Sequence, residues 1–304
     1  MSLFIVKCTT IFVVVKGFVY QSKIVLAFLC HFGLVSTRPL CLYTFAKNML
    51  TDHELKDYLE AQYKRYNRLD FIESDPIQIP HYYQRKEDQE ISGFLAATLA
   101  WGQRATIIKN SRRLMEMMDD APYDFIINHK KKDLERFSGF VHRTFHADDC
   151  KYYLHALKQL YKSHDGIEGS FNYIHKKNND LSETIHQWRQ LFLSFQSDPR
   201  QGKHIGDPLK NSTAKRMLMY LRWMVRKDQS GIDFGLWKAI KPSELYIPLD
   251  IHSARSARLL GLLTRTQNDW KAVNELTENL RKIEPKDPVK YDFALYGSSV
   301  NKSI

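Results

Sequence analysis

Apolar residues recur at helical spacing through most of this chain. In five long segments, residues three or four positions apart are apolar and would share one face of a helix. Alternation of apolar and polar residues, which is typical of half-buried strands, is nearly absent. The five segments cover residues 91–99, 107–118, 185–195, 217–225 and 270–283. This periodicity predicts an all-α protein with about ten helices.

Pro, Gly, Asp and Asn separate the helical segments. Such breaks stand at residues 75–76, 120–122, 206–208, 241–243 and 285–288. Two helix starts carry cap-type residues. Thr51 is followed three residues later by Glu54, which is the capping-box pattern and predicts a helix over 50–66. Asp269 directly precedes the segment that begins at Trp270.

Residues 1–48 differ in composition from the rest of the chain. They contain five Lys or Arg residues and no acid, so they carry +5 of the net charge of +11 and leave +6 for residues 49–304. Their longest uncharged stretch, 24–37, is shorter than the roughly 20 residues that a membrane helix needs. Three interpretations stand: residues that precede a natural start at Met49, a targeting or membrane segment, or a structural extension. We expect 1–48 to lie outside the fold and 49–304 to form it.

The remaining charge and cysteines limit the function classes. A charge of +6 over residues 49–304 is mildly basic and supports nucleic-acid binding only weakly. Cys150 is the single cysteine in that part, so it has no disulfide framework and no Cys/His metal spacing. We therefore expect a reducing, cytoplasmic setting and no bound metal.

The first of four polar segments is residues 95–106. An apolar helix runs into Trp101-Gly102-Gln103-Arg104 and then into a second amphipathic helix. A Gln-Arg pair at such a turn could enter a DNA groove or fill the gap left by an extruded base. The alternative is an ordinary helix break.

The second segment is residues 213–226, which combine an apolar face with four cations. Lys215, Arg216, Arg222 and Arg226 have no acid between them, and three of the four share roughly one side. This pattern fits a solvated basic face. It also fits a helix that follows phosphates and holds a lysine nucleophile.

The third segment begins with extended residues 247–249 and places Asp250 where a helix should start. Free amides and the helix dipole stabilise a carboxylate at that position. His252, Arg255 and Arg258 lie roughly along one side of the expected helix. Either Asp250 only caps the helix, or it is a fixed anion beside cations, as a nucleotide enzyme requires where a sugar develops positive charge.

The fourth segment, residues 202–212, is a polar, Gly-rich connector directly before the basic segment. Its backbone amides could hold a phosphate. The alternative is a simple loop.

Together these segments resemble the helix-hairpin-helix DNA glycosylase superfamily. Pro248-Leu-Asp-Ile-His252, followed by Arg255 and Arg258-Leu-Leu-Gly-Leu262, is similar to its block Pro-Val-Asp-x-His, Arg and Arg-Leu-Gly-Leu. The resemblance implies two helical subdomains that flank a cleft, with Asp250 as the catalytic aspartate. Residues 99–106 are similar to the Leu-Ser-x-Gln-x-Thr block, which implies that Gln103 fills the space left by a flipped base.

At closer range, residues 49–300 resemble an uncharacterised bacterial family, DUF2400. Four blocks carry this resemblance: Asp75-Pro-Ile-Gln-Ile-Pro-His81, Phe140-Val-His-Arg-Thr-Phe145, Leu221-Arg-Trp-Met-Val-Arg-Lys-Asp228 and Asp287-Pro-Val-Lys-Tyr-Asp-Phe-Ala294.

The chain departs from the superfamily at its lysine. Bifunctional members carry that lysine in a Leu-Pro-Gly-Val-Gly-x-Lys hairpin, which is absent here. Lys215 lies 35 residues before Asp250, closer to the spacing of the archaeal 8-oxoguanine glycosylase branch. The four cysteines that bind iron–sulfur in the endonuclease III branch are also missing, so the fold is better supported than the activity.

Our hypothesis from the sequence is a bifunctional glycosylase that removes a damaged purine, 8-oxoguanine first, from duplex DNA. Lys215 would attack C1′ to form a Schiff base, and Asp250 would stabilise the oxocarbenium-like charge. We expect a monomer without a small-molecule cofactor or stable membrane association. The alternatives are a non-catalytic DNA- or RNA-binding protein that retains the fold, and a membrane-associated protein directed by residues 1–48. The residues expected to contact DNA are Trp101, Gln103, Arg104, Arg222, His252, Arg255 and Arg258.

Overall fold

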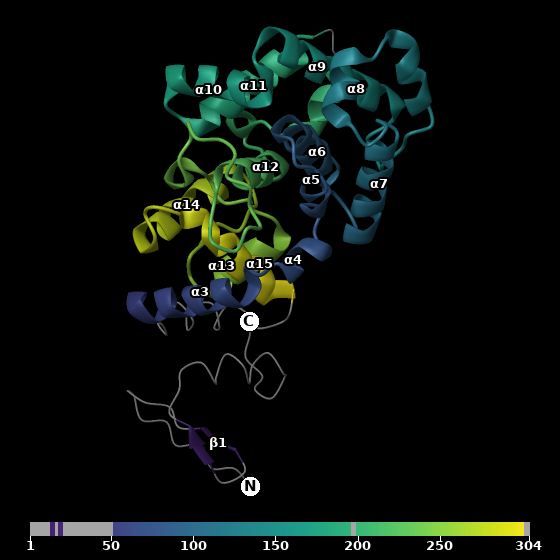
Figure 1. Cartoon of the computed structure of the whole chain (residues 1–304). Coiled ribbons are helices and arrows are strands. Elements are labelled where there is room, and N and C mark those ends of the chain that lie inside the picture. The colour runs from purple at the N-terminus through teal and green to yellow at the C-terminus, as the bar shows by residue number, and fades with distance from the viewer. Residues whose placement is uncertain (1–12, 16–17, 21–50, 196–198, 301–304) are drawn as a thin grey trace. The chain divides into compact units, whose positions relative to one another are not determined.

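The structure is a computed structural model that describes residues 13–15, 18–20, 51–195 and 199–300 (Figure 1). Near the N-terminus, β1 (Val13–Val15) and β2 (Phe18–Tyr20) form an antiparallel pair in which Val13 lies opposite Tyr20. The rest of residues 1–48, and the expected boundary after residue 48, lie outside the described residues. The interpretation of this segment therefore stays a prediction.

From Thr51 onward the described chain is helical, which confirms the all-α class for this part. Its extended pairing is limited to one bridge, between His142 and Phe145. Among the described residues, thirteen α-helices form where about ten are expected, because two of them have only four residues and are too short to show a period. The α-helices are α3 (Asp52–Tyr66), α4 (Asp70–Glu73), α5 (Gln78–His81), α6 (Lys86–Leu99), α7 (Arg104–Glu116), α8 (Pro122–Asn128), α9 (Ala147–Ser163), α10 (Gly166–Asn178), α11 (Leu181–Leu193), α12 (Lys215–Val225), α13 (Ile251–Leu259), α14 (Trp270–Ile283) and α15 (Tyr291–Val300). Short 3-10 helices are η1 (Lys131–Phe137), η2 (Pro199–His204), η3 (Pro208–Lys210), η4 (Pro242–Glu244) and η5 (Pro288–Lys290).

The predicted helix starts coincide with those in the structure. The backbone N–H of Thr51 donates to Glu54 Oε2 at 2.8 Å, and the N–H of Glu54 donates to Thr51 Oγ1 at 3.3 Å, which completes the capping box. Asp269 accepts from the backbone N–H of Ala272 and caps α14. None of the helices in the described ranges is both long and apolar enough to cross a bilayer.

The chain forms two compact units. The larger unit comprises residues 67–249 and 267–289, and holds α4 to α12 and α14. The smaller unit comprises residues 1–66, 250–266 and 290–304, and its described helices are α3, α13 and α15.

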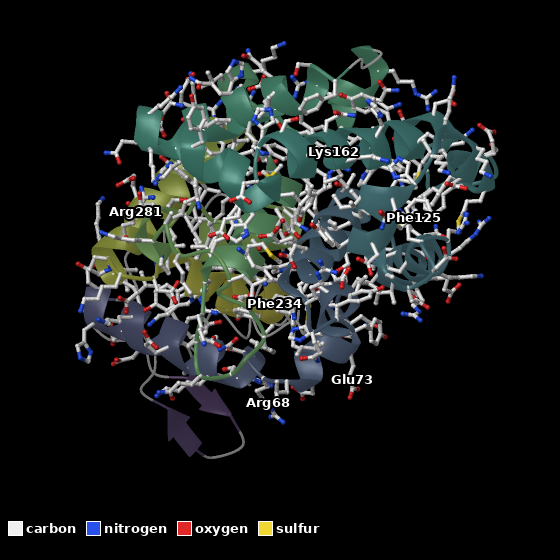
Figure 2. All side chains as sticks on the ribbon, turned by 45° about the horizontal axis from the view of Figure 1, so that its top comes forward. Arg68, Glu73, Phe125, Lys162, Phe234 and Arg281 are labelled. Atoms are coloured by element: carbon white, nitrogen blue, oxygen red, sulfur yellow. The ribbon has the colours of Figure 1, made fainter. Side chains whose placement is uncertain are left out.

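Helix α6 forms the centre of the larger unit. Every residue from Glu90 to Leu99 is buried, as expected of a helix surrounded by others. It packs against α5, α7, α8, α10 and α12. Phe94 stands at the middle of an aromatic core, with ring-centroid distances of 5.5 Å to Trp188 and 5.6 Å to Tyr220. Side chains fill the space between the ribbons (Figure 2).

Glu90 brings a carboxylate into this core. Its Oε2 accepts from the Tyr161 hydroxyl and its Oε1 from the Trp237 indole, both at 2.8 Å. The Lys86 ammonium lies 3.9 Å from the Glu90 carboxylate. Burial raises the pKa of Glu90 to about 7, against the opposing effects of these partners.

In the smaller unit, α15 packs against both α3 and α13. The Tyr291 hydroxyl and the Lys290 ammonium each lie 2.7 Å from Glu60 Oε1. Gly297 permits the close approach of α15, because a Cβ at this position would lie 2.3 Å from the ring of Tyr66.

Candidate nucleic-acid interface

The turn between α6 and α7 exposes the indole and the amide that the sequence singles out. Trp101 is 48% exposed, and Gln103, in extended conformation before α7, is also exposed. Gly102 has φ +118°, which L side chains rarely adopt. A Cβ on Gly102 would also lie 2.9 Å from Arg143 Nη1. The turn therefore requires glycine and presents two flat side chains to solvent.

Arg143 holds the indole in place. Its guanidinium lies over the Trp101 ring, 4.3 Å from the ring centre, which is a cation–π contact. Arg143 has φ +54° and follows His142, whose backbone exchanges hydrogen bonds of 2.8 and 2.9 Å with Phe145. The sequence alone indicated no role for Arg143, although the block that contains it supports the family resemblance. Its cation beside an exposed aromatic becomes visible only in the fold.

Arg104, the next residue after Gln103, forms contacts within the protein. Its Nη2 donates to Asp75 Oδ2 at 3.2 Å, and its guanidinium lies 5.6 Å from the centre of the Phe71 ring. The structure thus gives Arg104 an intramolecular partner at the start of α7. Its predicted contact with DNA stays a prediction.

Lys215 is the first residue of α12 and follows Ala214, which has φ +46°. No side chain caps this helix start. The Lys215 ammonium lies 3.4 Å from Met219 Sδ, and the residue is half-buried. Next to it, Arg216 Nη1 donates to the Thr98 carbonyl at 2.5 Å. That bond ties the start of α12 to the end of α6.

Three of the four polar segments meet around one small cavity in the larger unit. The end of α6, the 202–212 connector and the start of α12 each contribute to its lining, which includes Thr98, His204 and Arg216. Burial lowers the pKa of His204 to about 4, so this imidazole is neutral at pH 7. The cavity measures about 10 Å³, room for about one water molecule. In this conformation it does not admit a nucleobase.

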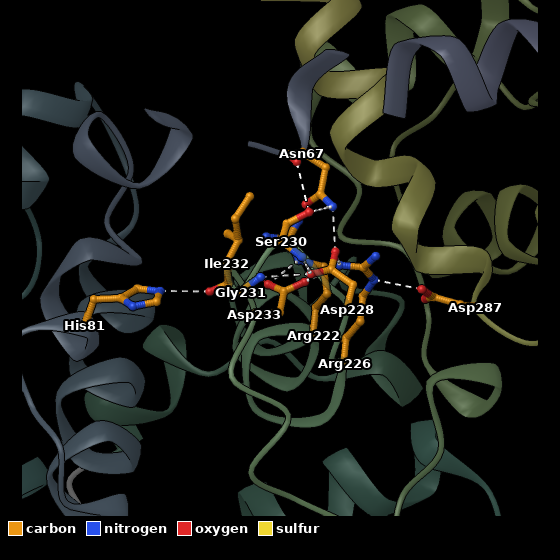
Figure 3. Close-up of polar contacts among 10 residues, drawn as sticks. All are labelled: Asn67, His81, Arg222, Arg226, Asp228, Ser230, Gly231, Ile232, Asp233 and Asp287. Atoms are coloured by element: carbon orange, nitrogen blue, oxygen red, sulfur yellow. Dashed lines mark hydrogen bonds and ion pairs between the residues drawn. The ribbon is translucent and has the colours of Figure 1, made fainter. Parts of the chain in front are cut away.

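The structure gives Arg222, predicted from the sequence to hold a DNA phosphate, a buried intramolecular partner, and its contact with DNA stays a prediction. Arg222 is buried, with Nε 3.3 Å from Asp233 Oδ1. Arg226 is fully buried, and its guanidinium lies 2.8 Å from Asp228, 2.9 Å from Asp233 and 2.9 Å from Asp287 (Figure 3). Two cations of the expected basic face, Arg222 and Arg226, therefore belong to an internal ion-pair network, whereas Lys215 does not.

The acids that neutralise these arginines come from other parts of the chain. Asp228 and Asp233 lie in the segment that follows α12, and Asp287 lies after α14. Asn67 extends the network, since its Nδ2 donates to Asp228 Oδ2 at 2.5 Å and to Ser230 Oγ at 2.7 Å. A buried cation requires such partners because its isolated burial is very costly.

In the smaller unit, Asp250 caps α13 as its local sequence predicts. Its Oδ1 accepts from the backbone N–H groups of His252 at 2.8 Å and Ser253 at 2.9 Å. Among the residues that the structure describes, no hydrogen bond to Oδ2 is seen. His252 and Arg255, which lie near Asp250 in the sequence of α13, are both exposed. His252 also makes an edge contact with Tyr296, with ring centres 5.7 Å apart.

Arg258 has a different position from Arg255. Its Nε donates to the Arg265 carbonyl at 2.8 Å, and its Nη2 to the Thr266 carbonyl at 2.9 Å. These bonds hold the loop that follows α13. The structure therefore gives Arg258 loop-closing partners where the sequence suggested a phosphate.

Comparison with known proteins identifies a family but no characterised relative. The family described as "Protein of unknown function (DUF2400)" matches residues 75–301. Neither the curated proteins nor the solved structures give a match.

Proposed function

The chain belongs to the DUF2400 family of proteins of unknown function, and we propose that it is a DNA-binding, base-excising protein of the glycosylase type. In this proposal Asp250 is the catalytic carboxylate and duplex DNA with a damaged base, an 8-oxoguanine-type purine first, is the substrate.

The geometry of Asp250 carries the proposal. Two backbone amides fix Oδ1 at the start of α13, while Oδ2 remains available to a ligand within the smaller unit. A helix N-terminus favours negative charge through its amides and dipole. Such a fixed anion would stabilise the positive charge that develops on a sugar as its glycosidic bond breaks. The exposed Arg255 and His252 would contact the adjacent phosphates.

The α6–α7 turn supports the DNA-binding part of the proposal. Base excision requires that a nucleotide leaves the stack, and a protein side chain commonly stabilises the gap. Trp101 is exposed and held by Arg143, so its indole can stack on a base without first being ordered. Gln103 beside it offers an amide to the unpaired base.

Lys215 would supply lyase activity. Its neutral amine would attack C1′ of the sugar as the glycosidic bond breaks and the base leaves with a proton. The sugar ring would then open between C1′ and O4′, which leaves C1′ bonded to Lys215 as a Schiff base. Its half-buried position at an uncapped helix start next to Arg216 supports this role. Nothing else in the proposal depends on Lys215.

The direct test is base excision by the full chain and by Asp250→Asn. Asn caps helices as well as Asp does, so the substitution should change stability by only about a few tenths of a kcal/mol. Excision should nevertheless fall by at least about 100-fold, because a fixed charge at the reacting centre is removed. Asp180→Asn is the matched control, since Asp180 caps α11 by accepting from the Ser182 N–H. Asp180→Asn should excise as the wild type does.

Borohydride trapping tests the lyase part separately. Duplexes that carry 8-oxoguanine, uracil or an abasic site are incubated with wild type and Lys215→Gln in the presence of borohydride. A covalent complex that requires Lys215 supports the Schiff base. If wild type forms no complex on any duplex, the lyase role is refuted, while excision by Asp250 is judged by the first assay.

One observation favours a second function, a non-catalytic DNA- or RNA-binding protein. The two hydrogen bonds that Asp250 accepts from backbone N–H groups give this residue a complete structural role as a helix cap. If that is its whole role, wild type will bind duplex DNA without releasing any base, and Asp250→Asn will bind equally well.

A further inference from the structure

Five lysines gather where α8, η1 and α9 meet in the larger unit. We refer to Lys130, Lys131, Lys132, Lys158 and Lys162 as the lysine patch. The first three are exposed and run into η1, while Lys158 and Lys162 are one turn apart on α9. Lys162 is labelled on the teal helix in Figure 2, well apart from Arg281 on α14.

The two parts of the lysine patch are joined by a direct contact. The Lys158 ammonium donates to the carbonyl of His129, the residue directly before Lys130. Helix α9 packs against both α8 and η1. Lysines that are about 30 positions apart in the chain therefore share one surface.

Two acids, Asp133 and Glu135, offset part of the charge of the lysine patch through space. None of its five lysines forms an ion pair with a carboxylate among the described residues. The nearby Asp133 instead accepts from the Lys130 backbone N–H at 2.7 Å. By contrast, the flanking Arg136 is paired with Asp119 and Lys151 with Glu135, each at 2.9 Å.

The lysine patch concentrates positive charge on one surface of the larger unit. Five lysines less the two acids Asp133 and Glu135 leave a formal charge of +3. Burial and the neighbouring Lys162 lower the pKa of Lys158, and burial and Lys158 lower the pKa of His129 and of His155.

We infer that the lysine patch is a contact surface for the phosphate backbone of duplex DNA, additional to the α6–α7 turn. The inference rests on the proposed DNA-binding function and extends it. Flexible ammonium groups without internal carboxylate partners suit phosphates, which carry charge but no sequence information. The lysine patch would then supply salt-dependent affinity, while the turn would recognise the disrupted base pair.

The test is the salt dependence of binding to an undamaged duplex, measured with the full chain by fluorescence anisotropy between about 50 and about 200 mM KCl. The patch variant carries Lys130→Ser, Lys131→Ser and Lys132→Ser. The matched control replaces three exposed lysines on and after α14, and so removes the same net charge: Lys271→Ser, Lys282→Ser and Lys286→Ser.

The plot of log K against log salt has a negative slope, which should become less steep in the patch variant. The change is about 0.9 for each phosphate that the protein no longer neutralises, so about 2 to 3 in total. Affinity near 50 mM KCl should fall by at least about 10-fold. The α14 control should keep the wild-type slope. Lys162→Ser, which leaves η1 unchanged, should make the slope less steep by about 0.9.

The outcomes separate this inference from the proposed function. If the patch variant keeps the wild-type slope while Trp101→Ala binds an abasic duplex more weakly, the lysine patch is refuted and DNA binding by the turn stands. Equal losses of affinity in the patch and α14 variants mean that only net charge matters, which also refutes it. Absence of any duplex binding by wild type refutes both.

Discussion

Replacing Arg226 with Met should destabilise the larger unit strongly. Arg226 is fully buried, and three aspartates lie 2.8 to 2.9 Å from its guanidinium. Met fills much of the same volume but leaves these carboxylates without their shared cation. Removing one partner of a buried ion pair costs about 3–5 kcal/mol. That is a large part of the roughly 5–15 kcal/mol that stabilises a typical folded protein.

Urea unfolding of the full chain measures this destabilisation, with Arg85→Met as the matched control. Arg85 also faces two carboxylates, at 3.2 Å from Glu87 and 3.0 Å from Asp124, but 46% of its side chain is exposed. Exposed pairs contribute about 0–1 kcal/mol. With a denaturant slope of about 3 kcal/mol per M, the urea midpoint should decrease by at least about 1 M for Arg226→Met and by less than about 0.3 M for Arg85→Met.

A double variant tests the stated cause, stranded negative charge. Adding Asp287→Asn to Arg226→Met removes one of the stranded carboxylates, so the double variant should be more stable than Arg226→Met alone. Equal midpoint shifts for Arg226→Met and Arg85→Met would refute the energetic argument. A double variant less stable than the single one would refute the stranded-charge explanation.

Three further outcomes are expected. The pKa of Glu90 is raised to about 7 in the folded state, so the folded protein holds a proton that the unfolded chain loses near pH 4.5. The free energy of unfolding should therefore fall by roughly 3 kcal/mol as pH rises from about 4.5 through about 7. Urea titrations should show that the stability of Glu90→Gln depends much less on pH. Gly102→Ala should lower the free energy of unfolding by about 1–2 kcal/mol, because Gly102 has a φ of +118°. Gly139→Ala is the control and should leave Tm nearly unchanged, because a Cβ there meets nothing within 4 Å. Equal Tm values for the two variants would contradict this. Trp101→Ala should weaken binding to an abasic duplex by about 5- to 150-fold, and Tyr173→Ala, which removes another exposed aromatic that contacts a cation, should not weaken it.

Features of the fold that depend on neighbouring residues could be predicted from the sequence. Thr51 with Glu54, Asp250 and Asp269 all cap helices where their spacing indicated, because a cap is formed by a side chain and amides two or three residues later. The long amphipathic helices were predictable for the same reason. The four-residue helices α4 and α5 were not, since one turn shows no repeat.

The candidate interface was predictable only in part, because its contacts join distant segments. The α6–α7 turn could be identified from Trp101 and Gln103, but the cation that holds the indole comes from Arg143, which is 42 positions away from Trp101. The lysine run at 130–132 is visible in the sequence, yet a net charge of only +6 over residues 49–304 hides it. The second half of the lysine patch comes from α9.

Arg222 and Arg255 show why a basic pattern alone does not identify a DNA contact. Both lie on amphipathic helices with neighbouring cations and no acid within one turn on the same helix. Arg222 is neutralised by Asp233, whereas Arg255 is exposed on α13. The difference comes from the acid-rich segment that follows α12, which brings Asp228 and Asp233 back onto that helix. A cation is available to DNA when the fold places no carboxylate beside it. Whether a carboxylate lies there depends on the path of segments outside the helix, which the pattern of the helix itself does not reveal.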